Sequence, residues 1–169
     1  ARLIQKLGFN GLDINMGCPD RAVEGQDAGA VLMKNPKLAQ TIIAAARVGA
    51  PKLPISVKTR LGYSYDQLDK WLPALLETDL AAIIIHARTR KEMSKVPAHW
   101  EALIRAVKIR DELKSKTLII GNGDVANLVE ARERAEETGV DGVMLGRAIF
   151  GNPWLFSENW KAIACSRSA

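Results

Sequence analysis

The sequence has few cysteines, few aromatic residues and no long hydrophobic run. Its 169 residues include two cysteines, Cys18 and Cys165, which are too few for a disulfide framework. We therefore expect a reducing, cytoplasmic setting. Aromatic side chains make up 5% of the residues, which argues against a surface that stacks many bases. No stretch approaches the roughly 18 apolar residues of a membrane span, so we expect no membrane association.

Two common kinds of site are also missing from the sequence. No grouping of His, Cys and carboxylate residues has the spacing of metal ligands, so we predict no metal site. No Walker motif occurs. The net charge of +5 permits an acidic partner such as RNA, but favours one only slightly, because many soluble proteins are this basic.

What the sequence does contain is an alternation of apolar runs and helical patterns. Several apolar runs are short and rich in β-branched residues, which is typical of a parallel sheet covered on both faces. The expected strands are Gly11–Asn15, Leu53–Thr59, Ala81–Ala87, Thr117–Gly121 and Asp141–Gly146. The expected helices are Pro36–Val48 with Asn35 as N-cap, Tyr65–Glu77, Trp100–Leu113 and Asn127–Glu137. This order predicts one α/β domain of five parallel βα units.

The number of units is too small for a closed barrel, which takes about 200 residues or more. The chain also opens within a helical pattern that ends at Gly8. We therefore predict a partial (β/α)8 TIM barrel over residues 1–160, with its N-terminal units absent, followed by a polar tail at 161–169. An open sheet is the alternative. Pro153–Lys161 is expected to be a closing helix, and unpaired edge strands favour self-association.

Polar clusters follow the expected strands, which places them at one end of the sheet, where barrels keep their chemistry. Cys18 follows the first strand in a turn forced by Gly17 and Pro19, so its thiol can face a pocket. Asn15 leaves the same strand end, and its amide can both donate and accept, which suits the edge of a base or a flavin. We favour a functional Cys18 over a small buried hydrophobe.

Basic residues follow the second and third strands. Lys58 and Arg60 share one face of a strand end, which suits a flavin ring, a phosphate or an anionic intermediate. His86 and Arg88 end the third strand in the same arrangement, and we favour a functional role for this histidine. Arg90 is better explained as part of a solvated loop.

Glycine-rich turns follow the last two strands. In barrels these two loops often form a phosphate site, because glycine lets the backbone approach the anion. Arg147 can clamp a phosphate through two N–H groups. Asp124 is better explained as the cap of the following helix than as a phosphate ligand, but we keep it among the expected cofactor-site residues. The other candidates are Asn122, Gly123 and Gly146.

Together these clusters resemble the tRNA-dihydrouridine synthases. The resemblance runs from about Gly8 to Phe156, and the five motifs follow the family's order, although single motifs are shared with other FMN barrels such as dihydroorotate and dihydropyrimidine dehydrogenases. The motifs are Asp13–Pro19, Val57–Gly62, Ile85–Arg90, Gly121–Asp124 and Gly146–Trp154.

The resemblance implies an FMN-dependent enzyme that uses NADPH to reduce the C5–C6 bond of uridine in tRNA. Reduced flavin would pass hydride to C6, and Cys18 would protonate C5. Asn15 would contact the flavin or the uracil. Lys58 and His86 would hold the flavin ring, with Arg88 close by. The FMN phosphate would be cradled by Asn122, Gly123, Gly146 and Arg147.

Two other functions stay open at this point. One is an FMN barrel that reduces a free pyrimidine or a similar small molecule. The other is an inactive half-barrel that self-associates or binds RNA without catalysis. After the His86 motif the sequence reads Ser94–Trp100, where the family usually has a Tyr-x-Gly-x-Ala-Asp-Trp-like stretch.

Overall fold

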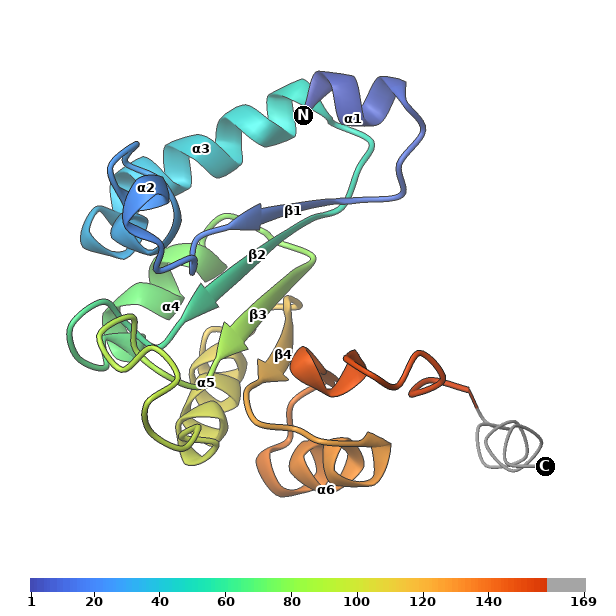
Figure 1. Cartoon of the computed structure of the whole chain (residues 1–169). Coiled ribbons are helices and arrows are strands. Elements are labelled where there is room, and N and C mark those ends of the chain that lie inside the picture. Colours follow the sequence, from blue (N-terminus) through green and yellow to red (C-terminus); the bar gives the residue numbers. More distant parts are fainter. Residues whose placement is uncertain (158–169) are drawn as a thin grey trace.

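A computed structural model describes residues 1–157 and contains one parallel sheet of five strands (Figure 1). The strands lie in chain order, each hydrogen-bonded in parallel to the next. They are β1 (Leu12–Asn15), β2 (Ile55–Arg60), β3 (Ala82–His86), β4 (Leu118–Asn122) and β5 (Gly142–Met144). The predicted α/β fold, a partial barrel with five parallel strands, is confirmed.

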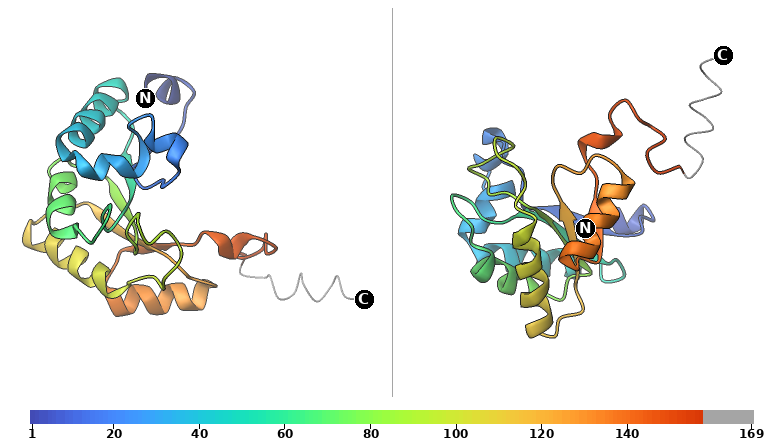
Figure 2. Two further views of the ribbon diagram at one scale, coloured as in Figure 1. Left: turned by 60° about the vertical axis from the view of Figure 1, so that its left-hand side comes forward. Right: turned by 90° about the horizontal axis from the view of Figure 1, so that it is seen from below.

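Helices connect the strands and cover one face of the curved sheet (Figure 2). Four of them, α3 to α6, pack side by side in chain order along the outer face of the arc. The α-helices are α1 (Arg2–Lys6), α2 (Arg21–Glu24), α3 (Pro36–Gly49), α4 (Leu68–Leu76), α5 (Glu101–Glu112) and α6 (Leu128–Thr138). Two 3-10 helices are η1 (Gly29–Lys34) and η2 (Arg147–Ile149).

The ends of α3 and α6 follow from local sequence. Asn35 accepts a hydrogen bond from Leu38 N at 3.1 Å, and Pro36 occupies the first helical position, as predicted. Asn127 caps α6 in the same way, through a 2.9 Å hydrogen bond from Glu130 N. The helix ends at Gly139, whose φ of +73° is the left-handed conformation that favours glycine.

The core lies between the sheet and the outer helices. Val57, Ile83 and Ile119 point from three neighbouring strands into this layer and are fully buried. They pack with Trp71 of α4 and Leu103 of α5. Strand residues of the opposite parity, such as Lys58, face the concave side, because side chains alternate across a strand. The sheet therefore has an apolar outer face and a concave face that carries polar residues.

Two predicted helices differ from the structure, and two short helices were not predicted. Residues 153–156 form turns instead of the start of the predicted helix Pro153–Lys161. The part of that helix beyond residue 157 and the predicted tail at 161–169 lie outside the described residues. The helix predicted at Tyr65 begins at Leu68, because the Asp66 carboxylate accepts a hydrogen bond from Leu68 N at 2.9 Å. The short helices α2 and η1 were not predicted.

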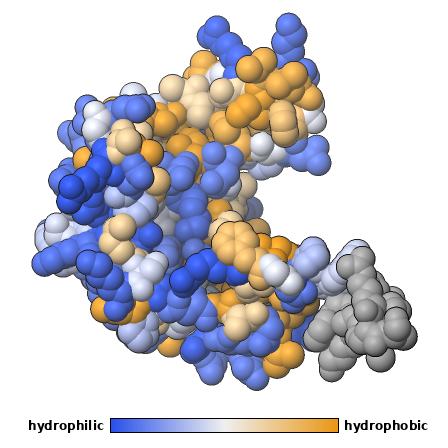
Figure 3. Space-filling view, viewed as in Figure 1, coloured by the Kyte–Doolittle hydropathy of each residue, from blue (hydrophilic) through white to orange (hydrophobic). Residues whose placement is uncertain are grey.

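The described residues enclose an open arc, with the concave side of the sheet facing its mouth (Figures 1 and 2). Apolar side chains gather on both sides of this mouth (Figure 3). Within residues 1–157, no helix has the length and hydrophobicity needed to cross a membrane.

Candidate functional site

The carboxyl ends of the strands bring the predicted site residues into neighbouring positions. Asn15 of β1 is paired in register with Lys58 of β2. Two residues after Lys58, Arg60 is in register with His86 of β3 and, through it, with Asn122 of β4. Register partners in a parallel sheet point to the same face, so these side chains line one end of the concave side.

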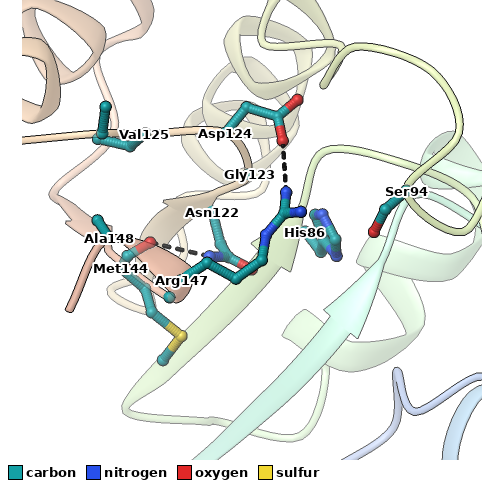
Figure 4. A pocket seen from close by; sticks show the side chains of 11 residues that line it. His86, Ser94, Asn122, Gly123, Asp124, Val125, Met144, Arg147 and Ala148 are labelled. Atoms are coloured by element: carbon teal, nitrogen blue, oxygen red, sulfur yellow. Dashed lines mark hydrogen bonds and ion pairs between the residues drawn. The ribbon is translucent and has the colours of Figure 1, made fainter. Parts of the chain in front are cut away.

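A cavity of about 540 Å³ lies at this end of the sheet, over β3, β4 and β5 (Figure 4). Six predicted site residues line it, together with five that were not predicted. The predicted ones are His86, Asn122, Gly123, Asp124, Gly146 and Arg147. The others are Ser94, Val125, Ala126, Met144 and Ala148. Ala148 lies within the motif Gly146–Trp154 and Ser94 within the stretch Ser94–Trp100, but neither was predicted as a site residue.

Asp124 does not cap the following helix, contrary to the prediction. That cap is Asn127, and the Asp124 carboxylate instead accepts hydrogen bonds from Arg88, from Ala98 N at 3.0 Å and from Arg147 at 3.1 Å. Burial raises the pKa of this carboxyl, but the hydrogen bonds and the two guanidinium groups outweigh burial and hold its pKa below the ordinary value. Asp124 is therefore an ionised carboxylate between two arginines.

Arg88 lies behind the cavity and is buried, with 2% of its surface exposed. Its guanidinium donates to Val96 O at 2.6 Å, to Asp124 and to His86 Nε2, 3.1 Å away. Because a guanidinium can only donate, Nε2 of His86 accepts and Nδ1 carries the proton. Burial, reinforced by the charges of Arg60, Lys58 and Arg88, lowers the pKa of His86 to about 3. This imidazole is neutral and presents an N–H donor.

Lys58 stands on the concave face between Asn15 and β3 and does not line the cavity. Burial lowers the pKa of Lys58 to about 8, with the Arg60 charge acting in the same direction and Asp13 opposing it. Its ammonium is therefore protonated at neutral pH, but close to its titration point. A desolvated donor of this kind suits an electronegative ring atom of a ligand.

Asn15 shapes the turn that carries Cys18. Its side-chain oxygen accepts hydrogen bonds from Gly17 N at 3.0 Å and from Cys18 N at 2.9 Å. Among residues 1–157 the Asn15 Nδ2 has no protein partner, so this group is available to a ligand. Cys18 is half-buried, carries a free thiol and does not line the cavity. Cys165 lies outside the described residues.

Arg90 is not part of a solvated loop, contrary to the prediction. Its guanidinium binds both carboxylate oxygens of Glu24, at 2.8 and 2.5 Å. The reason is tertiary: α2 brings Glu24 to the loop that follows β3, which no local pattern reveals. Glu24 and its further partner Tyr63 were not predicted as part of the site.

These residues and their order agree with a comparison against known families. Residues 1–168 match the dihydrouridine synthase (Dus) family. The chain belongs to the dihydrouridine synthase family. The resemblance inferred from the five motifs is therefore confirmed at the level of the family.

Named members of the dihydrouridine synthase family are close in sequence to this chain. The probable tRNA-dihydrouridine synthase 2 of Bacillus subtilis (strain 168) is 48% identical over 157 residues, which cover 92% of this chain and 48% of that protein. The probable tRNA-dihydrouridine synthase of Staphylococcus aureus (strain MRSA252) is 48% identical over 164 residues, which cover 96% and 49%. The chain thus spans about half the length of these relatives.

Among solved structures, the chain is similar to 2,3-dimethylmalate lyase, a member of the PEP mutase/isocitrate lyase superfamily. The TM-score is 0.62 at 15% identity, over 94% of this chain and 58% of the lyase. At this identity the similarity concerns the fold alone, and it agrees with a partial (β/α) barrel.

The donor groups at the strand ends do not form a metal site. Within residues 1–157, no group of three or more His, Cys, Asp or Glu side chains is arranged to hold a metal ion. The site of this member of the dihydrouridine synthase family instead combines cations, neutral donors and glycine backbone, a set that suits an anionic or polar organic ligand.

Proposed function

We propose that this chain forms the strand-end part of an FMN-dependent enzyme that reduces uridine to 5,6-dihydrouridine in tRNA. The observation that carries the proposal is the convergence of His86, Asn122, Gly123, Asp124, Gly146 and Arg147 on one cavity, in a chain of the dihydrouridine synthase family. The reaction and the substrate in this proposal are taken from the names of the relatives, which are probable tRNA-dihydrouridine synthases.

The cavity fits the phosphate end of FMN. A Cβ atom at Gly123 would lie 2.8 Å from Ala98 Cβ, so only glycine leaves this wall open. Apart from its chain neighbours, no heavy atom of residues 1–157 lies within 4 Å of a Cβ atom built at Gly146, so a ligand can approach its backbone. The exposed Arg147 guanidinium can turn from Asp124 towards a phosphate.

Asp124 has a different role in this proposal from that of a phosphate ligand. An ionised carboxylate repels a phosphate dianion, and this carboxylate is held in its charged form. Its place is to orient Arg88 and Arg147, and its remaining lone pairs can accept from a hydroxyl group of the FMN side chain.

The flavin, reduced by NADPH, would supply the hydride that is added to C6 of the uracil ring. Lys58 would donate from its ammonium group to the flavin ring, and His86 would donate from Nδ1. The Cys18 thiol would give its proton to C5, and solvent would then return a proton to the sulfur. Asn15 holds the turn of Cys18 through Oδ1 and would bind the ligand through Nδ2.

Replacing Cys18 tests the proposed acid. Cys18→Ala should lower the turnover of uridine in tRNA by at least about 100-fold, because no other group replaces the thiol proton. FMN affinity should stay unchanged, since Cys18 does not line the cavity. Turnover is measured as dihydrouridine formed in unmodified tRNA, and binding by flavin fluorescence. Normal turnover by the variant would remove the acid role.

The remaining alternatives differ in what they act on. Reduction of free uracil without reduction of tRNA would favour the small-molecule enzyme. A protein that binds no FMN, even when FMN is added in excess, would favour the inactive half-barrel.

The net charge of +5 of this chain is complementary to the negatively charged backbone of tRNA. We also propose a cytoplasmic location, in keeping with the small number of cysteines.

A further inference from the structure

Three side chains outside the cavity form one hydrogen-bonded unit, which we call the Glu24 clamp: Glu24, Arg90 and Tyr63. Arg90 binds Glu24 through two parallel N–H···O bonds of 2.8 and 2.5 Å, the arrangement that gives a carboxylate–guanidinium pair its strength and fixed geometry. The Tyr63 hydroxyl donates to Glu24 Oε2 at 3.2 Å. The clamp thus joins α2 to the loops that follow β2 and β3.

The clamp is shielded and reinforced. The side chains of Arg90 and Glu24 are 23% and 11% exposed, so solvent screens this pair less than a surface ion pair. The hydrogen bond with Glu24 raises the pKa of Arg90 above its ordinary value. Lys34, the last residue of η1, places its ammonium 3.8 Å from the centre of the Tyr63 ring, a cation–π contact.

Hydrogen bonds to the backbone carbonyl groups of residues 17–19 hold the turn that carries Cys18 from several sides. Arg60 Nε donates to Gly17 O at 2.9 Å, and Ala30 N of η1 donates to Cys18 O at 2.9 Å. Arg90 Nη2 reaches Pro19 O at 3.5 Å, on the other side of the cysteine. Each backbone carbonyl from residue 17 to residue 19 therefore has a donor.

The clamp supplies the anchor on the C-terminal side of this turn. Arg90 is itself fixed, because its backbone N donates to Gly62 O at 2.8 Å and joins the loop after β3 to the loop after β2. The same guanidinium holds Glu24 and Pro19, so it fixes both the helix that follows Cys18 and the peptide next to it. Without the clamp, residues 19–24 would lose these hydrogen bonds to the loop that follows β3.

We propose that Glu24, Arg90 and Tyr63 are positioning residues that hold the Cys18 thiol in place at the carboxyl end of the sheet, next to the end of β1. They touch neither the cavity nor the thiol, and they act through the backbone of residues 17–20 and through α2. The inference deepens the proposed function and rests on it for the acid role of Cys18. The geometric part, that the clamp restrains Cys18, stands without it.

The geometric part is tested by the reaction of Cys18 with iodoacetamide, followed by intact mass in a Cys165→Ser background, so that one thiol is present. Glu24→Gln and Arg90→Gln should each raise the alkylation rate about fivefold, because the freed turn opens more often. Combining both changes should add little to either, since they break the same contact. Rates equal to the parent, or effects that simply add, would overturn the clamp.

Arg110→Gln is the matched control for this experiment. Arg110 of α5 is also a shielded arginine in an ion pair, 2.6 Å from Asp141. Asp141 directly precedes β5, so this pair lies at the opposite end of the strands from Cys18. Its replacement should leave the alkylation rate of Cys18 unchanged. An equal rise in this variant would show that general loss of stability exposes the thiol, and would also overturn the proposal.

A second arm uses dihydrouridine formation. Glu24→Gln should lower kcat with little change in KM for tRNA or in FMN affinity, because the acid is displaced while the binding groups stay. A loss confined to KM would contradict positioning of Cys18. If the parent protein forms no dihydrouridine, the proposed function fails, and the alkylation rates still decide whether the clamp restrains Cys18.

Discussion

At the scale of the residue, charge and burial together determine what the strand-end groups can do. Lys58 and His86 both lie near Arg60 and both have lowered pKa values, but the consequences differ. With a pKa of about 8 the lysine stays charged at neutral pH, whereas with a pKa of about 3 the histidine is neutral. The site therefore offers one charged and one neutral donor, a combination suited to a polar aromatic ring.

The lowered pKa of His86 predicts a loss of stability in mild acid. In the unfolded chain a histidine binds a proton near pH 6.5, whereas in the folded chain it does so near pH 3, so stability falls as pH falls between these values. The slope is at most about 1.4 kcal/mol per pH unit, and partial exposure of the ring reduces it. His86→Asn keeps an acceptor for Arg88 and should flatten this slope.

Urea unfolding at several values between about pH 6.5 and 5 measures the slope, in a range above the ordinary carboxyl values. His99 is present in both proteins, so the difference between them isolates His86. Equal slopes in the parent and the variant would contradict a neutral, buried His86.

Single residues were predicted well where the signal was local. The position of Cys18 in the turn after β1, the cap by Asn35 and the strand-end positions of Lys58 and His86 follow from neighbouring residues. The role of Asp124 and the pairing of Arg90 do not, because their partners Arg88 and Glu24 are distant in sequence. Long-range ion pairs of this kind leave no periodic or positional signal.

At the scale of the element, β4 packs closely against α5 at Gly121, where there is no room for a larger side chain. A Cβ atom at Gly121 would lie 2.5 Å from a ring carbon of Trp100 and 2.9 Å from Leu103 Cδ1. The Trp100 indole N–H donates to Gly123 O at 2.8 Å, so the ring cannot move away without losing that bond. This contact seats the helix against the strand that leads to the cavity.

Gly121→Ala should lower the free energy of unfolding by about 1–3 kcal/mol, the usual cost of overpacking a core. Gly146→Ala is the control, because in the described part of the chain no heavy atom other than those of its chain neighbours lies within 4 Å of the new methyl group. Chemical unfolding monitored by circular dichroism compares the two variants with the parent. Similar stability for both variants would contradict the close packing of Trp100 on β4.

Elements with strong periodic patterns were predicted from the sequence, and short ones were not. All five strands are found, with bounds shifted by one to two residues at most positions, because β-branched runs such as Ala82–His86 carry a clear signal. The four-residue α2 and the 3-10 helix η1 are too short for periodicity. Residues 153–156 form turns where a helix was predicted to begin.

At the scale of the whole molecule, the open arc leaves apolar surface and unpaired strand edges. Leu118 and Met144, which lie on the concave side, are 48% and 39% exposed, and Leu3, Leu7 and Phe9 are exposed near the N-terminus. Within residues 1–157, the edge strands β1 and β5 each pair with one neighbouring strand and leave their other side unpaired. Self-association of the chain stays a prediction, for which an exposed edge gives the physical reason.

The measurement that tests the central claim most directly is a titration of the purified chain with FMN, followed by flavin absorbance and fluorescence. If the strand-end residues form the FMN site, the flavin spectrum shifts and its fluorescence is quenched at saturation. Arg147→Ala should then weaken binding by about tenfold, the effect of losing one charge-assisted contact to phosphate, while Arg110→Lys binds like the parent. An unchanged flavin spectrum with excess FMN, or equal affinity for Arg147→Ala and the parent, would contradict the account.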